Sequence, residues 1–199
     1  MTVLSLAGLT DGPLSEFGAA LAFLGALAGL GVGHLPGDTI LQSDTAAQSK
    51  GYPSDDRLAA GAPPWPGWGH CLAHVGSYLA AQAVMLAIVA QVVPMTWPGL
   101  AAALAISGST HAVIDRRWPV RWVITRKQCT GWADAHFWID QAMHWVCLLV
   151  AAVLAARIST GTGAALAAGA GLLLIGDALR YEARHARGVT ATAAPTDRL

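Results

Sequence analysis

The chain has 199 residues, of which 54% are hydrophobic and only 12% are charged, and its mean hydropathy is +0.48. These values exclude an ordinary soluble domain, in which about a quarter of the residues are charged. The 12 basic and 12 acidic side chains give a formal net charge of zero, so net charge by itself identifies no class of partner.

Long runs without Asp, Glu, Lys or Arg predict helices that cross a membrane. A crossing needs roughly 20 apolar residues, and these runs lack the alternation of β-strands, so their backbone must form its hydrogen bonds within helices. We therefore expect an all-α polytopic membrane bundle that forms one domain over residues 1–181. The five expected helices cover about residues 15–35, 70–93, 99–115, 133–156 and 162–181.

The connections differ strongly in composition. Residues 36–69 form a polar loop rich in Pro and Gly, and Pro36-Gly37 is expected to break the first helix and leave Asp38 on irregular backbone. A basic, Trp-rich loop follows the third helix. Residues 182–199 form a polar cytoplasmic tail, expected to be disordered near Ala194-Pro195. The first sixteen residues contain no Lys or Arg, which favours a retained first helix over a signal peptide.

The basic residues predict the orientation. Eleven of the 12 lie in the first loop, the basic loop or around the tail, on one side of the bundle, and only Arg157 lies on the other side. The positive-inside rule then places the N-terminus outside, the C-terminus inside and loop 36–69 in the cytoplasm. We expect a multi-pass protein of the bacterial cytoplasmic membrane in contact with membrane lipids. No nucleic-acid partner is expected, because the basic residues lie at the membrane.

Histidine and aspartate residues gather at one end of the expected bundle. Such residues are rare in membrane helices and mark functional sites. They lie at the ends of the first and third helices and at the starts of the second and fourth, which all face the same side. The two connections on the opposite side contain none. The candidate metal ligands are His34, Asp38, His74, His111, Asp115, Asp140 and His144.

The spacing of these residues supports a metal site. His111 and Asp115, like Asp140 and His144, are four residues apart and so lie on one helix face. Imidazole and carboxylate ligands from several helices are the usual way in which a bundle builds a metal site. Mixed nitrogen and oxygen ligands suit one or two divalent ions of Zn, Mn or Fe. The alternative is a buried ionic network that only fixes the helix register.

Several polar residues near this cluster have two interpretations. Asp177 is either a further participant or a helix-end residue, and Gln42 and Gln141 are either hydrogen-bond donors to the ligands or ordinary boundary residues. His70 and His136 are weaker candidates at the outer edges of their helices. The arginines of the basic loop are most simply topology determinants and contacts to anionic lipids, and phosphate binding is the less favoured interpretation. They are Arg116, Arg117, Arg121 and Arg126.

Four spaced motifs resemble a known bacterial membrane family. Residues 33–42 (GHLPGDTILQ) look like the HxxGDxxLQ opening of the family catalogued as domain of unknown function 3307. The later signatures follow in the same order: His74, the pair His111-x3-Asp115, and Asp140-Gln141-x2-His144. The resemblance covers residues 34–147 and departs from the family in the long first loop and in Pro36. The family has no assigned activity, and its pattern is similar in style to that of membrane-bound metal-dependent hydrolases.

The leading functional prediction is a metal-dependent hydrolase at the cytoplasmic interface, acting on a lipid-linked or amphiphilic substrate. The metal would lower the pKa of a bound water, and Asp38 or Asp140 would accept the proton. The alternative is a non-catalytic membrane protein, either an ion- or proton-binding carrier or an assembly or scaffold subunit. Transport is less favoured because the later helices have few polar residues beyond the cluster.

Overall fold

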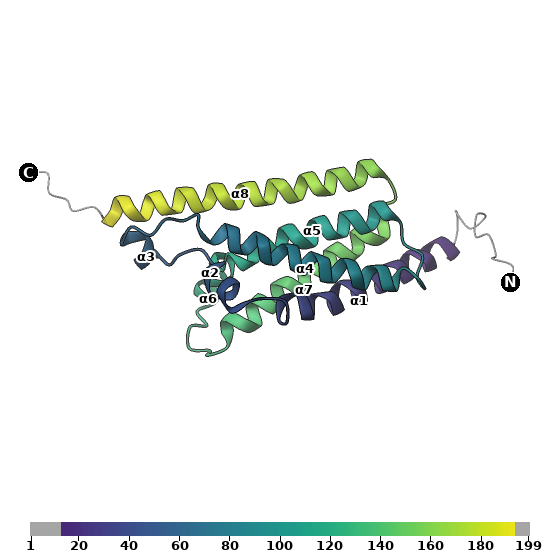
Figure 1. Cartoon of the computed structure of the whole chain (residues 1–199), viewed down its shortest axis with the longest axis horizontal. Helices are drawn as coiled ribbons and strands as arrows, with labels where there is room; N and C mark the ends of the chain where they lie inside the picture. Colours follow the sequence, from purple (N-terminus) through teal and green to yellow (C-terminus); the bar gives the residue numbers. More distant parts are fainter. Residues whose placement is uncertain (1–12, 194–199) are drawn as a thin grey trace, which may run out of the picture.

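The computed structural model describes residues 13–193, and this part of the chain consists of helices without a strand (Figure 1). In chain order the helices are α1 (Pro13–Asp38), α2 (Asp44–Ser49), α3 (Asp55–Ala59), α4 (Gly67–Val89), α5 (Trp97–Asp115), α6 (Trp118–Lys127), α7 (Ala135–Arg157) and α8 (Gly161–Ala193). The five longest run along the length of the molecule, and α2, α3 and α6 lie toward one end (Figure 1).

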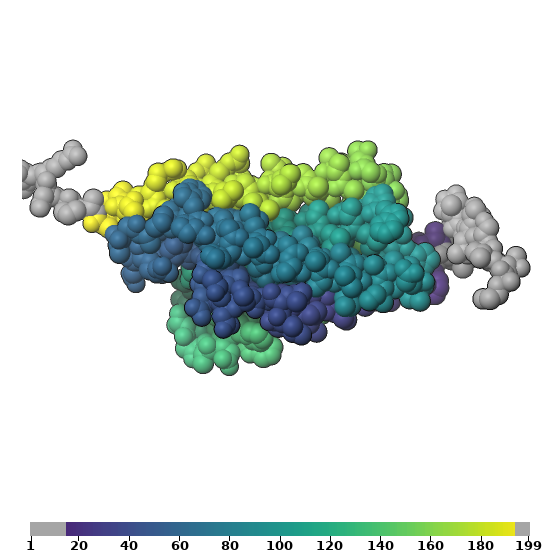
Figure 2. Space-filling view, viewed as in Figure 1, coloured from purple at the N-terminus to yellow at the C-terminus, as the bar shows by residue number. Residues whose placement is uncertain are grey.

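Four of these helices, α1, α4, α7 and α8, are long and apolar enough to cross a membrane. The expected all-helical architecture is therefore confirmed, with four helices that could span a membrane. The fifth long helix, α5, is not among them. It contacts α4, α7 and α8, and most of its residues are buried. The space-filling view shows α8 as a ridge along one edge of the molecule (Figure 2).

A row of glycines on α1 brings its backbone against α4. Glycines recur every fourth residue, on one helix face, at Gly25, Gly29, Gly33 and Gly37. A Cβ atom on Gly33 would lie 2.6 Å from the Cα of Gln82, and one on Gly37 would lie 3.0 Å from the Tyr78 ring. Small residues at such positions let two membrane helices approach closely. This seam sets the separation between the last turn of α1 and the middle of α4, which both carry candidate ligands.

The first helix continues through Pro36, so the expected break there is wrong. Helix α1 ends at Asp38, and the amide of Thr39 still donates to the Leu35 carbonyl at 3.1 Å. A proline removes one N–H donor, which in this position leaves a single carbonyl, that of Val32, without its usual partner. The packing of Gly37 against α4 holds the turn in place. Asp38 is therefore helical and not on irregular backbone.

The two long loops that the sequence predicted, residues 36–69 and the basic loop, are partly helical. Residues 36–69 contain α2 and α3, and the Ser43 hydroxyl caps α2 by accepting from the Ala46 amide at 3.2 Å. The basic loop contains α6. Arg117, just before this helix, has a φ of 64°, and Gln128, just after it, has a φ of 53°. These left-handed residues reverse the chain sharply on each side of α6.

The last helix extends beyond the expected boundary at residue 181. Helix α8 continues to Ala193, and Glu182 and Ala186 are buried in it. Ala186 packs with Tyr52 and Leu58 from the first loop. Residues 182–193 are therefore a packed helical extension, not a free polar tail. The disorder predicted near Ala194-Pro195 lies outside the described residues.

Candidate metal centre

The structure brings all seven predicted ligand residues to one end of the bundle. The last turn of α1 carries His34 and Asp38, whereas α4 carries His74. The end of α5 supplies one pair, and the first half of α7 supplies the other. Their side chains are buried or partly buried. The pairs on α5 and α7 are His111 with Asp115 and Asp140 with His144.

Four of these residues form a compact group with one ligand atom each: Asp38 Oδ1, His74 Nε2, His111 Nε2 and Asp115 Oδ2. The two histidine nitrogens are 3.1 Å apart. The four distances from these nitrogens to the two carboxylate oxygens range from 3.2 to 3.6 Å. Ligands about 2.0–2.1 Å from a tetrahedral zinc ion lie roughly 3.3–3.4 Å from one another. Five of the six distances within the group are therefore close to those between the ligands of a tetrahedral zinc ion, and all four atoms lie within 4.8 Å of one another.

A second group lies beside the first and shares Asp38 with it. Its ligand atoms, from Asp38, Asp140 and His144, lie within 4.8 Å of one another. His144 Nε2 is 3.5 Å from Asp140 Oδ2 and has no hydrogen-bond partner among the described residues. This nitrogen faces carboxylate oxygens, as a ligand of a cation would. His34 belongs to neither group.

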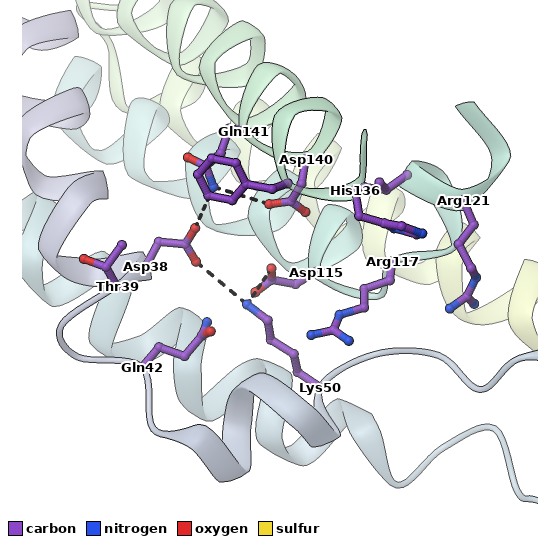
Figure 3. Close-up of a pocket in the computed structure, with 12 residues that line it drawn as sticks. Asp38, Thr39, Gln42, Lys50, Asp115, Arg117, Arg121, His136, Asp140 and Gln141 are labelled. Carbon is purple, nitrogen blue, oxygen red and sulfur yellow. Dashed lines mark hydrogen bonds and ion pairs between the residues drawn. The ribbon is translucent and has the colours of Figure 1, made fainter. Parts of the chain in front are cut away.

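Two glutamines lie against the ligand residues. Gln42 Nε2 lies 2.9 Å from His74 Nε2, the atom that would bind the ion. Gln141 Nε2 donates to Asp38 Oδ2 at 3.2 Å (Figure 3). Its Oε1 lies 3.1 Å from His34 Nε2. His34 thus orients Gln141, which in turn orients Asp38. Partners of this kind hold ligands in place around metal ions.

Lys50, at the end of α2, lies inside the cluster, and the sequence prediction missed it. Its Nζ is 2.7 Å from Asp115 Oδ1 and 3.8 Å from Asp38 Oδ1 (Figure 3). With Asp140, the cluster holds three carboxylates and one ammonium, which leaves two negative charges when the carboxylates are ionised and the histidines neutral. Buried charge is unfavourable unless it is compensated, and a divalent cation has the compensating charge. No local pattern distinguishes Lys50 from any other loop lysine.

Other polar candidates lie outside the two ligand groups. Asp177 is exposed and pairs with Arg180 at 2.8 Å, so it does not take part in the cluster. His70 is exposed at the start of α4. His185 contacts the hydroxyl of Tyr52 at 3.3 Å. His136 is exposed and lines the neighbouring cavity.

A cavity of about 530 Å³ opens onto the cluster. The three carboxylates form part of its wall, and Lys50 lies beside them. Arg117 and Arg121 project from α6 on the side of His136 (Figure 3). The lining residues are Asp38, Thr39, Gln42, Lys50, Asp115, Arg117, Val120, Arg121, His136, Phe137, Asp140 and Gln141.

Arg116 lies next to Asp115 in sequence but points away from the cavity into a second buried network. Its guanidinium bonds both carboxylate oxygens of Glu182, at 2.8 and 3.1 Å, and both side chains are fully buried. The interpretation of Arg116 as a lipid contact is therefore wrong. Arg116 also donates to the Lys50 carbonyl at 2.7 Å, so its ion pair with Glu182 of α8 helps to position Lys50.

Tyr52, in the first loop, belongs to the same buried network. Its hydroxyl donates to the Glu182 carbonyl at 2.9 Å. Burial, with a smaller contribution from the nearby Glu182 carboxylate, raises the pKa of Tyr52 from 10.0 to about 12. The first loop, the end of α5 and the extension of α8 are thus joined by buried polar contacts beside the cluster.

Comparison with known proteins adds the family and nothing about activity. No curated protein and no solved structure matches the chain significantly. The family model described as "Protein of unknown function (DUF3307)" matches residues 27–168, which include every candidate ligand. Because the match spans most of the sequence, the chain belongs to this family of proteins of unknown function.

Proposed function

We propose that the protein is a membrane-embedded, metal-dependent hydrolase that acts on a lipid-linked or amphiphilic substrate. One observation carries the proposal. Two histidine nitrogens from two helices lie 3.1 Å apart and 3.2 to 3.6 Å from two carboxylate oxygens, close to the spacing of tetrahedral ligands, beside a cavity large enough for a substrate headgroup. A register-fixing ionic network does not require this tetrahedral spacing.

The two groups suit different tasks. The four-ligand group would hold a closed ion, as structural zinc sites do, whereas the three residues of the second group would leave a ligand position open for water. A bound ion lowers the pKa of such a water and polarises the scissile group. Asp140 lines the cavity and keeps a quarter of its side-chain surface exposed. Its second carboxylate oxygen is the acceptor that we propose for the proton of the water.

The proposed setting is the bacterial cytoplasmic membrane, with five crossings. Helix α5 runs beside α4, α7 and α8, and its serines and threonine face a protein interior that tolerates them. Among the described basic residues, Arg157 is the one at the end of the bundle opposite the cluster. The positive-inside rule then supports a cytoplasmic site and an external N-terminus.

A carrier for protons or ions is the second candidate. Tyr78 stacks on His111 with ring centroids 3.8 Å apart. Hydrogen bonds continue from Tyr78 through Ser107 to Gln82, farther into the bundle than the sequence indicated. Gln82 then donates to the Leu30 carbonyl at 3.1 Å, and among the described residues this chain of hydrogen bonds stops there. A path that ends inside the bundle supports a role in helix packing better than one in transport.

Metal content tests the proposal directly. We would purify the full chain in detergent, supply Zn, Mn and Fe in separate preparations, and measure bound metal by mass spectrometry. His74→Ala and Asp115→Asn remove one ligand each from the four-ligand group. His70→Ala, one turn away on the same helix, and Asp177→Asn, exposed on α8, are the matched controls.

We expect near-stoichiometric metal in the wild type and in both controls, and a loss in both ligand variants. Metal-loaded protein would then be incubated with phospholipids, lipid phosphates and lipid-linked esters. Hydrolysis that Asp140→Asn abolishes in a folded protein would support the assignment. A wild type that takes up no metal, or a loaded protein that hydrolyses none of these substrates, would count against it.

A further inference from the structure

The cavity contains a pair of arginines that the cluster itself does not use. Arg117 is the residue just before α6 and Arg121 lies in the first turn of α6, and both line the cavity (Figure 3). Two like charges that line one cavity repel each other. Among the described residues, neither makes an ion pair with an acidic side chain. An anion between or beside them would relieve this repulsion.

Backbone contacts hold both guanidinium groups in place. Arg117 donates to the Ala47 carbonyl at 2.6 Å, and Arg121 donates to the Tyr52 carbonyl at 3.0 Å. Partial burial lowers the pKa of Arg121, with Arg117 acting in the same direction and Asp55 opposing it. The side chains are therefore preorganised and incompletely neutralised. Preorganisation reduces the entropy that is lost when a ligand binds.

The charges of the cavity match a phosphoryl group once a divalent ion is present. Its lining holds three cationic side chains, Lys50, Arg117 and Arg121, and three carboxylates, those of Asp38, Asp115 and Asp140. With all of them ionised these charges cancel, so one divalent ion makes the site positive by two and two such ions make it positive by four. A phosphomonoester carries about −1.5 to −2 charges at neutral pH. A neutral headgroup would gain nothing from this arrangement.

An apolar side chain in the cavity wall, and exposed apolar residues next in sequence to other lining residues, favour an amphiphile over a water-soluble phosphate ester. Phe137 lines the cavity and is 58% exposed. Ile40 and Leu41 follow the lining residue Thr39 and are exposed, and Trp122 follows Arg121 and is also exposed. Near a membrane surface, exposed indole and aliphatic side chains can pack against lipid headgroups and acyl chains.

We propose that this cavity binds the phosphomonoester headgroup of a lipid, with Arg117 and Arg121 holding phosphoryl oxygens on the side opposite the metal cluster. The inference rests on the proposed function and specifies its substrate class. It also assigns to these two arginines the phosphate-binding role that the sequence favoured less. Arginine suits this task because its planar guanidinium can bind two oxygens at once.

Calorimetric titration of the zinc-loaded full chain tests the site. The probes are dihexanoyl phosphatidic acid, inorganic phosphate and dihexanoyl phosphatidylcholine. The variants are Arg117→Gln and Arg121→Gln, with Arg126→Gln as the control, because Arg126 lies on the same helix but does not line the cavity. Loss of one charged hydrogen bond should weaken phosphatidic acid binding about tenfold in each site variant and leave the control nearly unchanged.

The three probes distinguish a lipid phosphate from free phosphate as the ligand. Tight binding of phosphatidic acid with weak binding of phosphate identifies a lipid ligand, whereas equal binding of both overturns the lipid part of the proposal. Zinc content is measured on the same samples. A wild type that binds no zinc would argue against the proposed hydrolase. If the zinc-loaded variants Arg117→Gln and Arg121→Gln bind phosphatidic acid as tightly as the wild type, only the proposed headgroup site is rejected.

Discussion

The glycine seam between α1 and α4 leads to a sharp prediction about Gly33. In Gly33→Ala the added Cβ would lie 2.6 Å from the Cα and 3.0 Å from the backbone nitrogen of Gln82. Both are backbone atoms, so neither can swing aside as the end of a side chain would. In the matched control Gly18→Ala, on the same helix, the added Cβ has no heavy atom within 4 Å.

The magnitude follows from the missing space. Non-bonded carbon atoms are normally about 3.5–4.0 Å apart, so the helices must separate by about 1 Å or distort locally. Overpacking of this kind costs about 1–3 kcal/mol. Alanine also gains about 0.5–1 kcal/mol over glycine within a helix, and this gain is common to both variants. We therefore expect Gly33→Ala to unfold about 1–3 kcal/mol more easily than Gly18→Ala.

The same substitution should weaken metal binding. Asp38 lies five residues beyond Gly33 on α1, and it is 3.3 Å from His74 Nε2 on α4. A seam opened by about 1 Å moves these ligands apart, and zinc ligands keep their bond lengths closely. We expect the zinc affinity of Gly33→Ala to fall and that of Gly18→Ala to equal that of the wild type.

Denaturant titration of the metal-free protein in detergent, followed by far-ultraviolet circular dichroism, measures the stability difference. Removing the metal avoids the added stability that a bound ligand provides. Zinc affinity is measured separately by competition with a chelator. Equal unfolding midpoints for the two variants would refute the reasoning, because the backbone approach would then have no energetic consequence.

Two further predictions concern the buried network beside the cluster. Glu182→Gln leaves the Arg116 guanidinium buried without its ionic partner, so we expect a loss of about 3–5 kcal/mol in unfolding free energy. Asp177→Asn breaks an exposed pair and should cost at most about 1 kcal/mol; equal losses in the two variants would contradict this account. The raised pKa of Tyr52, from 10.0 to about 12, favours the neutral phenol in the folded state. The stability that this shift contributes is therefore complete below pH 10 and is lost as the pH rises through 12. When the unfolding free energy is measured against pH, Tyr52→Phe should lose less stability than the wild type between pH 10 and 12. The same loss in both proteins would exclude the effect.

Local composition was enough to predict the five long helices and the end of the bundle at which the polar residues gather. Charge-free runs and the 3.6-residue period are properties of short segments, so they survive without any knowledge of the fold. The one-turn spacing of His111 and Asp115 likewise predicted that these two side chains share a face, and their atoms lie 3.2 Å apart. The boundary at residue 181 failed because the polar composition of the last segment concealed a buried face, with Glu182 at its centre.

Pro36 shows where local rules mislead. Its missing amide argues for a helix break, yet the adjacent Gly37 packs against Tyr78 and the turn is retained. The stabilising contact comes from a helix about forty residues away. Its effect depends on how α1 and α4 dock, which no local pattern reports.

The neighbouring residues Arg116 and Arg117 mark the limit most clearly. As adjacent arginines in a basic loop they look equivalent, but one is buried against Glu182 and the other lines the cavity. Lys50 reaches Asp115 across 65 positions of sequence for the same kind of reason. Hydropathy and spacing along the chain therefore sufficed to predict the five long helices and the common end of the bundle where the candidate ligands lie. The environment of each charge depended on the tertiary structure, because burial and pairing arise from the relative positions of helices that are distant in sequence.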